Sequence, residues 1–105
     1  MELDAGELLA KLETSPRDFT VLDVREYFEL SRGVLPEAVV IPMSELMQRV
    51  DQIDKSRPVV CYCEHGVRSY DVAAWLNQQG YEAQSLSGGF AEWTGPVVPW
   101  QPPQT

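Results

Sequence analysis

The apolar positions of this chain form short, nearly continuous runs. Three of them, FTVLDV (19–24), AVVI (38–41) and PVVCY (58–62), are rich in β-branched and aromatic residues. Such runs are typical of strands that are covered on both faces, as in a parallel sheet. YEAQSL (81–86) predicts a further short strand, and the SGG that follows it predicts a tight turn.

The first helical pattern lies near the amino end. Asp4 and Glu7 have the spacing of a capping box. The leucines that follow them predict a helix over 5–13, and the stretch TSPRD is expected to end it.

Two further helices are predicted between the later strands. Ser44 is placed to cap a short helix over 45–50, whose expected buried side chains are Leu46, Met47 and Val50. A longer helix is predicted from residue 68 or 69 to residue 79, because apolar side chains recur there at helical spacing. Gly80 stands where a helix commonly ends in a left-handed glycine.

Strands and helices therefore alternate along the chain. This order predicts a small α/β fold with a mostly parallel central sheet, flanked by helices on both faces. A single domain over 1–94 contains all of these elements, including one helical turn at FAEW. Residues 95–105 hold four prolines and are expected to form a Pro-rich C-terminal tail that hugs the surface or frays.

Composition narrows the range of functions. The 105 residues are 44% hydrophobic and carry a formal net charge of −8. This charge argues against direct binding of nucleic acid, whose phosphates attract clustered Lys and Arg. No window approaches the roughly 18 apolar residues that predict a membrane span. The start, MELDAGELLAKL, lacks the features of a secretory signal, so we expect a cytoplasmic protein whose two cysteines are thiols.

The stretch CEHGVRS (63–69) carries the candidate chemistry. Cys63 follows the strand over 58–62, at the sheet edge where ligands of parallel α/β folds bind. The loop then runs into a helix, so its amides and the helix dipole favour a thiolate. Gly66 can take a positive φ, and Arg68 adds a cation suited to an anionic sulfur or a substrate oxyanion. A cysteine alone is more typical of a small buried hydrophobic residue at the end of a strand, and it is this combination that predicts a nucleophile.

These residues resemble a known family. The stretch CEHGVRS (63–69) resembles the active-site loop of rhodanese-like sulfurtransferases. The later stretch VAAWLNQQGYEAQSLSGGFAEW (72–93) resembles the helix and the closing Gly-Gly-x-x-x-Trp turn of the same family. LDVREYFELSRGVLPEAVVIP resembles the family's upstream Asp-Val-Arg, later Glu, Gly-x-x-Pro-x-Ala turn and Ile-Pro. The resemblance covers residues from about 5 to 93 and implies a small rhodanese-like fold.

The resemblance also implies roles for individual residues. Cys63 matches the catalytic cysteine, which accepts a sulfane sulfur and holds it as a persulfide. The residues implied to form the persulfide-binding loop are Glu64, His65, Gly66, Val67, Arg68 and Ser69. The residues implied to give structural support are Asp23, Arg25 and Glu29. Trp93 matches the turn beneath the site, together with Gly88 and Gly89, and is interpreted as a core residue.

Two other residues near Cys63 have simpler interpretations. Cys61 lies inside the predicted strand and is interpreted as core. His65, the only histidine, is expected to shape the loop or contact substrate, because sulfur transfer between thiols needs no dedicated base once the thiolate exists. The two cysteines and His65 also resemble a metal cluster, but no further cysteine or histidine completes a soft site, so no metal is predicted.

The chain departs from the family pattern at three positions. It has GVLPEA where the family usually has Gly-His-Ile-Pro-Gly-Ala, so Val34 and Glu37 are expected to alter the local turn. Glu64 places a carboxylate beside the nucleophile, which would raise the pKa of Cys63 and repel a dianion such as thiosulfate. We therefore expect weak use of thiosulfate and a preference for a less charged or protein-bound persulfide donor.

The leading hypothesis is a sulfurtransferase that moves sulfane sulfur from a thiosulfate- or persulfide-type donor to a thiol or cyanide acceptor through a Cys63 persulfide. It needs no organic cofactor, and its expected partners are a small sulfur donor and a thiol acceptor, including a sulfur-carrier protein. Phosphatases of related fold are disfavoured, because the resemblance gives them one loop residue more than the four between Cys63 and Arg68. The alternative is a non-catalytic rhodanese-like binding or redox-sensing module.

Overall fold

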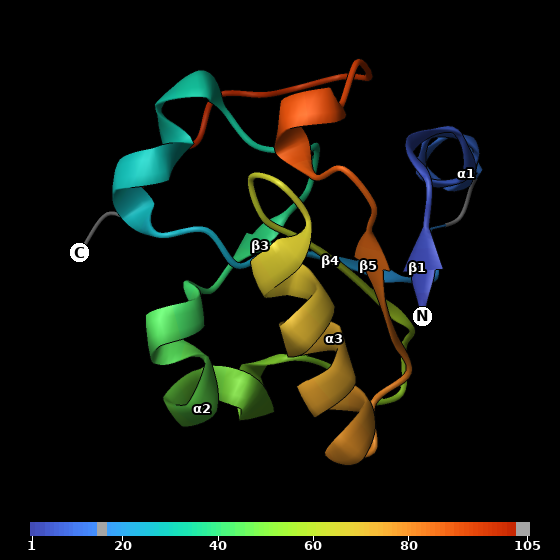
Figure 1. Ribbon diagram of the computed structural model, residues 1–105, viewed down its shortest axis with the longest axis vertical. Coiled ribbons are helices and arrows are strands. Elements are labelled where there is room, and N and C mark those ends of the chain that lie inside the picture. The colour runs from blue at the N-terminus through green and yellow to red at the C-terminus, as the bar shows by residue number, and fades with distance from the viewer. Residues whose placement is uncertain (15–16, 103–105) are drawn as a thin grey trace.

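The computed structural model describes residues 1–14 and 17–102. Its centre is a five-stranded sheet in the order β1-β5-β4-β2-β3, in which every neighbouring pair is parallel (Figure 1). The strands are β1 (Glu2–Leu3), β2 (Thr20–Asp23), β3 (Val39–Val40), β4 (Val59–Tyr62) and β5 (Ala83–Leu86). The predicted α/β fold is confirmed, and β1 is an additional edge strand that is too short to leave an apolar run in the sequence.

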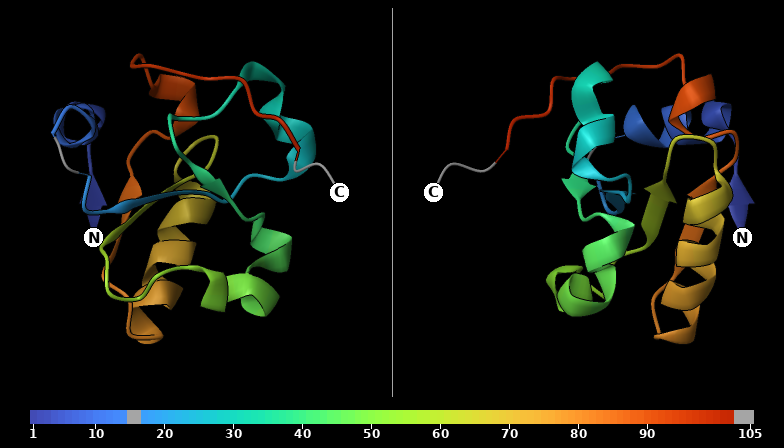
Figure 2. Two further views of the ribbon diagram at one scale, coloured as in Figure 1. Left: turned by 180° about the vertical axis from the view of Figure 1, so that it is seen from behind. Right: turned by 60° about the vertical axis from the view of Figure 1, so that its left-hand side comes forward.

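Helices pack on both faces of this sheet. The α-helices are α1 (Ala5–Leu12), α2 (Leu46–Arg49) and α3 (Val67–Gln78). Four 3₁₀ helices accompany them: η1 (Tyr27–Arg32), η2 (Met43–Glu45), η3 (Val50–Gln52) and η4 (Phe90–Glu92). The views of Figures 1 and 2 show α2 and α3 side by side, with α1 away from them at the β1 edge. None of the helices within the described residues is long and apolar enough to cross a membrane.

Two separate apolar clusters explain why the strands are apolar at nearly every position. Successive side chains of a strand point to opposite faces of the sheet. Leu22 and Cys61 therefore join one cluster, which contains the buried side chains of α2 and α3. Val21 and Val60 join the other, which lies against α1 and η4. Both faces of β2 and β4 are buried, and this leaves the carboxyl ends of the strands as the accessible edge.

The helix boundaries mostly follow the sequence signals. Asp4 accepts a hydrogen bond from the Glu7 amide at 2.8 Å, and Glu7 accepts one from the Asp4 amide at 3.0 Å, so the predicted capping box is present. α1 ends at Leu12, one residue before the predicted end, and the stretch TSPRD expected to end it includes residues 15 and 16, which lie outside the described residues. Gly80 has a φ of 91°, as predicted for a glycine just after a helix.

The helix predicted over 45–50 is wrong in its cap and at one of its three expected buried side chains, while Leu46 is buried and Val50 packs partly buried against the same cluster. The segment is divided into η2, α2 and η3, and Met47 follows Leu46 within α2, so the two side chains point about 100° apart around the helix axis. Leu46 is buried, but the side chain of Met47 is 79% exposed. Ser44 does not cap the helix; its amide and hydroxyl donate to Glu26 instead, at 3.2 and 2.8 Å.

The described part of the C-terminal tail lies against the domain. Val98 and Val34 exchange two backbone hydrogen bonds, each 2.8 Å long, in an isolated antiparallel bridge. The ring of Trp100 stacks on Tyr27 with 5.5 Å between ring centroids. The tail was expected either to lie along the surface or to fray, and its described residues lie along the surface. Residues 103–105 lie outside the described part.

Candidate active site

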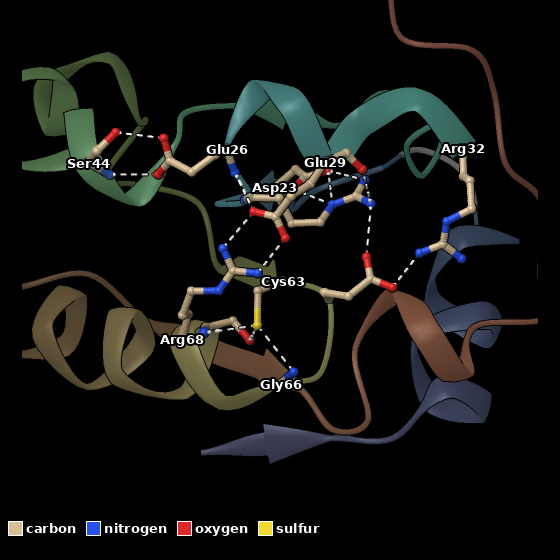
Figure 3. Close-up of polar contacts among 11 residues, drawn as sticks. Asp23, Glu26, Glu29, Arg32, Ser44, Cys63, Gly66 and Arg68 are labelled. Atoms are coloured by element: carbon tan, nitrogen blue, oxygen red, sulfur yellow. Dashed lines mark hydrogen bonds and ion pairs between the residues drawn. The ribbon is translucent and has the colours of Figure 1, made fainter.

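Cys63 lies directly after β4, at the carboxyl edge of the sheet, and its sulfur is surrounded by hydrogen-bond donors (Figure 3). The amide of Gly66 donates to Cys63 Sγ at 3.1 Å, and the amide of Ser69 donates at 3.4 Å. Gly66 has a φ of 91°, and a Cβ built there would lie 3.2 Å from the Gly88 amide nitrogen. The glycine is therefore needed both for the backbone conformation and for the close approach of the two turns.

These donors favour the charged form of the sulfur. Burial opposes a charge on Cys63, but hydrogen bonds from the Ser69 hydroxyl and from the amides of Ser69, Gly66 and His65 outweigh it and lower the pKa of the Cys63 thiol. Cys61 is different, because burial raises the pKa of its thiol to about 12. The Cys61 side chain is fully buried, as predicted for a core residue, and it donates to the Ser69 carbonyl at 3.3 Å.

Arg68 is bound to a carboxylate rather than directed at the sulfur. Its Nη1 and Nη2 donate to the two carboxylate oxygens of Glu29, each at 2.7 Å. This fork lowers the pKa of Glu29 to about 2 and raises the pKa of Arg68. The pair joins the start of α3 to η1 and so fixes one side of the loop (Figure 3). Arg68, expected to suit an anionic sulfur or a substrate oxyanion, is therefore held in place by Glu29, and the charge of Cys63 also contributes to its raised pKa.

Asp23 and Arg25 form a fully buried ion pair below the same loop. Arg25 Nη2 donates to Asp23 at 2.7 Å and to the Gly33 carbonyl at 2.8 Å, while Nη1 donates to the Glu29 carbonyl at 3.3 Å. Burial disfavours the charge of Arg25, but the hydrogen bonds and the charge of Asp23 outweigh it and raise the pKa of Arg25. Arg25 thus connects the end of β2 to the backbone that carries η1.

Glu64 is the neighbour of Cys63 in the sequence, but its carboxylate is paired with arginines from another segment. Its carboxylate binds Arg32 and also lies 3.5 Å from Arg25 Nη1 (Figure 3). Two cations therefore compensate this charge. The net pKa of Cys63 is lowered, and the expectation that Glu64 opposes this shift stays a prediction, with Arg25 and Arg32 now found beside its carboxylate.

The outer surface of the loop carries two exposed side chains. Val67 is 72% exposed at the start of α3, and the His65 side chain is also exposed. Neither side chain makes a polar contact with another described residue.

The turn after β5 supports the backbone of Cys63 and Glu64. The amide of Phe90 donates to the Cys63 carbonyl at 2.9 Å, and the amide of Ala91 donates to the Glu64 carbonyl at 2.9 Å. A Cβ at Gly89 would lie 2.6 Å from both carbonyl oxygens, so only glycine permits this contact. Trp93 packs behind the turn with 9% of its surface exposed and donates to the Pro96 carbonyl at 3.0 Å, in agreement with its predicted core role.

The segment GVLPEA has two residues, Val34 and Glu37, that differ from the residue types usual in the family. Val34 is buried and pairs with the C-terminal tail through its backbone. Glu37 has a φ of 61°, the left-handed conformation that favours the glycine usually found in the family, and its side chain binds Arg17 at 3.1 Å. A non-glycine residue therefore stands here with a positive φ, and the expected change in local turn geometry stays a prediction.

Sequence reasoning missed three residues of the site. Arg32 and Glu26 occur in no motif, and only the path of η1 brings them near the loop. Ser85 lies in β5 and contacts the hydroxyl of Ser69 at 2.8 Å. The one signal in the sequence that could have identified Ser85 is that it is a polar residue at a strand position where an apolar, buried residue is expected.

Comparisons with known proteins agree with this geometry. The family model described as "Rhodanese-like domain" matches residues 4–96. A protein of Allochromatium vinosum named "Sulfurtransferase" is 36% identical over 104 residues, which are 98% of this chain and 96% of that protein. A Coxiella burnetii protein named "Thiosulfate sulfurtransferase GlpE" is 37% identical over 92 residues, which are 87% of this chain and 81% of that protein.

Solved structures give the same result. A crystal structure of a rhodanese-related protein from Thermoplasma volcanium has a TM-score of 0.84 and 32% identity, covering 92% of this chain and 96% of that one. A rhodanese-like domain protein from Staphylococcus aureus has a TM-score of 0.85 and 29% identity, covering 96% and 100%. With the cysteine loop, the parallel sheet and these matches in agreement, the chain belongs to the rhodanese-like domain family and is a rhodanese-type sulfurtransferase.

Proposed function

We propose that Cys63 carries the transferred sulfur as a persulfide. The Cys63 thiolate attacks the outer sulfur of a donor R–S–S⁻, a new S–S bond forms, and the thiolate R–S⁻ leaves. With thiosulfate the leaving group is sulfite. A thiol or cyanide then attacks the outer sulfur of the Cys63 persulfide, which returns the Cys63 thiolate and yields an acceptor persulfide or thiocyanate.

The observation that carries this proposal is the set of donors on Cys63 Sγ. The amides of Gly66 and Ser69 and the Ser69 hydroxyl all lie within 3.5 Å of the sulfur. They stabilise the thiolate before the reaction, and the same loop can stabilise the anionic outer sulfur afterwards. No organic cofactor takes part in either step. The two free thiols suit a reducing compartment such as the cytoplasm.

The charges around the loop favour a donor whose reacting group carries less negative charge than the two charges of thiosulfate. Each arginine of the cluster in Figure 3 is bound to a carboxylate, and carboxylates outnumber arginines. The members are Arg25, Arg32 and Arg68, and Asp23, Glu26, Glu29 and Glu64. Thiosulfate carries two negative charges at the reacting group, and this cluster leaves no unpaired cation for it. In glutathione persulfide the carboxylates lie away from the reacting sulfur, so we infer that it is the better donor.

Mass measurement of the intact protein tests the sulfur carrier. Reduced wild type, Cys63→Ser and Cys61→Ser are incubated separately with thiosulfate and with glutathione persulfide. We expect one added sulfur atom in the wild type and in Cys61→Ser, its removal by a thiol, and no gain in Cys63→Ser. If folded, reduced wild type gains no sulfur from either donor, the proposal fails and the binding or redox-sensing module is favoured.

The donor preference is tested with Glu64→Gln. This substitution frees the charge of Arg32, so the ratio of kcat/KM for thiosulfate to kcat/KM for glutathione persulfide should rise by about two- to five-fold. Taking the ratio cancels any general damage to the loop. Glu82→Gln, an exposed residue at the start of the β5 segment, is the matched control and should leave the ratio unchanged. An unchanged ratio in Glu64→Gln would contradict the charge argument.

A further inference from the structure

Two buried hydroxyl groups lie in line behind the sulfur of Cys63. Ser69 belongs to the first turn of α3, and Ser85 belongs to β5. Both side chains are completely buried. The two hydroxyl oxygens are 2.8 Å apart, and the Ser69 oxygen is 3.5 Å from Cys63 Sγ. The order of contacts is therefore Ser85, Ser69 and the reactive sulfur.

The surroundings of Ser85 give its hydroxyl a single partner. On the sheet it lies beside Cys61, and this face belongs to the apolar cluster under α3. Among the described residues, the Ser85 hydroxyl makes no side-chain hydrogen bond except the one with Ser69. A buried hydroxyl is unfavourable without a partner, and packing alone would be served equally well by alanine.

The direction of the hydroxyl protons follows from this arrangement. Each serine has one proton to donate. When Cys63 is a thiolate, Ser85 donates to Ser69 and Ser69 donates to Sγ, so both protons have an acceptor. If the chain ran the other way, from a thiol to Ser69 and on to Ser85, the Ser85 proton would have no acceptor among the described side chains. The pair therefore matches the anionic form of the sulfur.

We propose that Ser85 is a positioning residue that directs the Ser69 hydroxyl toward Sγ and thereby stabilises the Cys63 thiolate. Ser85 acts only through Ser69, since its own hydroxyl contacts Ser69 and not the sulfur. The inference rests on Cys63 as the reactive thiol of the proposed function, but it does not depend on the donor or the acceptor.

The pH profile of Cys63 alkylation by iodoacetamide tests this role, because only the thiolate reacts. The rate at Cys63 is followed by peptide mass mapping in the wild type, Ser85→Ala, Ser69→Ala and the double variant. At about pH 6 we expect Ser85→Ala to react about two- to five-fold more slowly than the wild type, and the difference to vanish where the thiol is fully ionised. Ser87→Ala, an exposed serine two residues further along, is the matched control and should follow the wild type.

The double variant separates positioning from a general structural effect. If Ser85 acts through Ser69, Ser85→Ala should have no further effect in the Ser69→Ala background. A wild-type profile for Ser85→Ala, or a full additional shift in the double variant, overturns the inference. Ser85→Thr and Ser85→Val provide a second comparison if alanine does not fold, because they have similar shape and differ in the hydroxyl: the inference requires the valine variant to be the slower of the two.

The alkylation result and the sulfur-loading result are independent. A shifted profile without sulfur loading from any donor would leave the role of Ser85 in place and reject sulfur transfer. Normal sulfur loading with an unshifted profile would do the opposite.

Discussion

The ion pair between Glu29 and Arg68 gives a quantitative prediction. Both oxygens of Glu29 accept from Arg68 at 2.7 Å, and the pKa of Glu29 falls from its ordinary value of 4.5 to about 2. This fall corresponds to at most about 3.4 kcal/mol of stability at neutral pH. The Arg68 side chain is 35% exposed and the Glu29 side chain 17%, so solvent screening reduces the expected contribution to about 1–2 kcal/mol. Glu29→Gln should therefore lower the free energy of unfolding by this amount at pH 7.

The pH dependence of this loss distinguishes the ion pair from packing. The pKa of Glu29 is lowered in the folded state, so its contribution is complete above about pH 4.5 and is lost as the pH falls toward about 2. Urea unfolding of the wild type and of Glu29→Gln, at pH 7 and at about pH 3, measures the difference. At about pH 3 we expect less than half of the difference that is found at pH 7.

An exposed carboxylate outside the cluster provides the control for Glu29→Gln. Glu82→Gln replaces an exposed carboxylate outside the cluster and should change the stability by less than about 0.5 kcal/mol. A difference for Glu29→Gln that stays constant between the two pH values would show that the side chain acts through packing or neutral hydrogen bonds, and that the ion-pair reasoning is wrong.

Two further predictions concern the supports of the loop. Asp23→Asn leaves the buried guanidinium of Arg25 without its anionic partner, so the free energy of unfolding measured in urea should fall by about 3–5 kcal/mol. A fall of less than about 1 kcal/mol would mean that Arg25 is compensated by its carbonyl contacts and Glu64. Glu37→Gly removes a side chain from a residue with a φ of 61°, so it should raise the free energy of unfolding by up to about 1 kcal/mol, although the exposed ion pair with Arg17 is lost. A decrease in the free energy of unfolding would show that the ion pair outweighs the backbone strain.

Much of the fold could be predicted because it follows from local patterns. Apolar runs identified β2, β3 and β4, since a strand buried on both faces has few positions that tolerate a polar side chain. The capping box at Asp4 and the glycine at residue 80 are short-range signals, and both act as the sequence indicated. The predicted helix over 45–50 failed at Met47, because a side chain one residue after Leu46 points about 100° away from it around the helix axis, whereas Val50, four residues on, shares its face.

The partners of the charged residues depend on contacts between distant parts of the chain. Arg68 and Glu29 are 39 residues apart, and Arg32 and Glu64 are 32 residues apart. Without these contacts, Arg68 resembles a free cation and Glu64 resembles a charge that acts on Cys63. The pairing adds an opposite charge beside each of them, and a charge held by an opposite charge exerts a smaller net field on a third group.

The sequence by itself determined the strands β2 to β5, the loop and the position of the nucleophile at the end of β4. Those features follow from residues that are neighbours in the chain. Only the tertiary structure decided which carboxylate each arginine binds, and that the hydroxyl of Ser85 lies behind Ser69. The physical reason is that a change of a few tenths of an ångström between donor and acceptor decides whether a hydrogen bond forms. The packing of the whole sheet sets those distances.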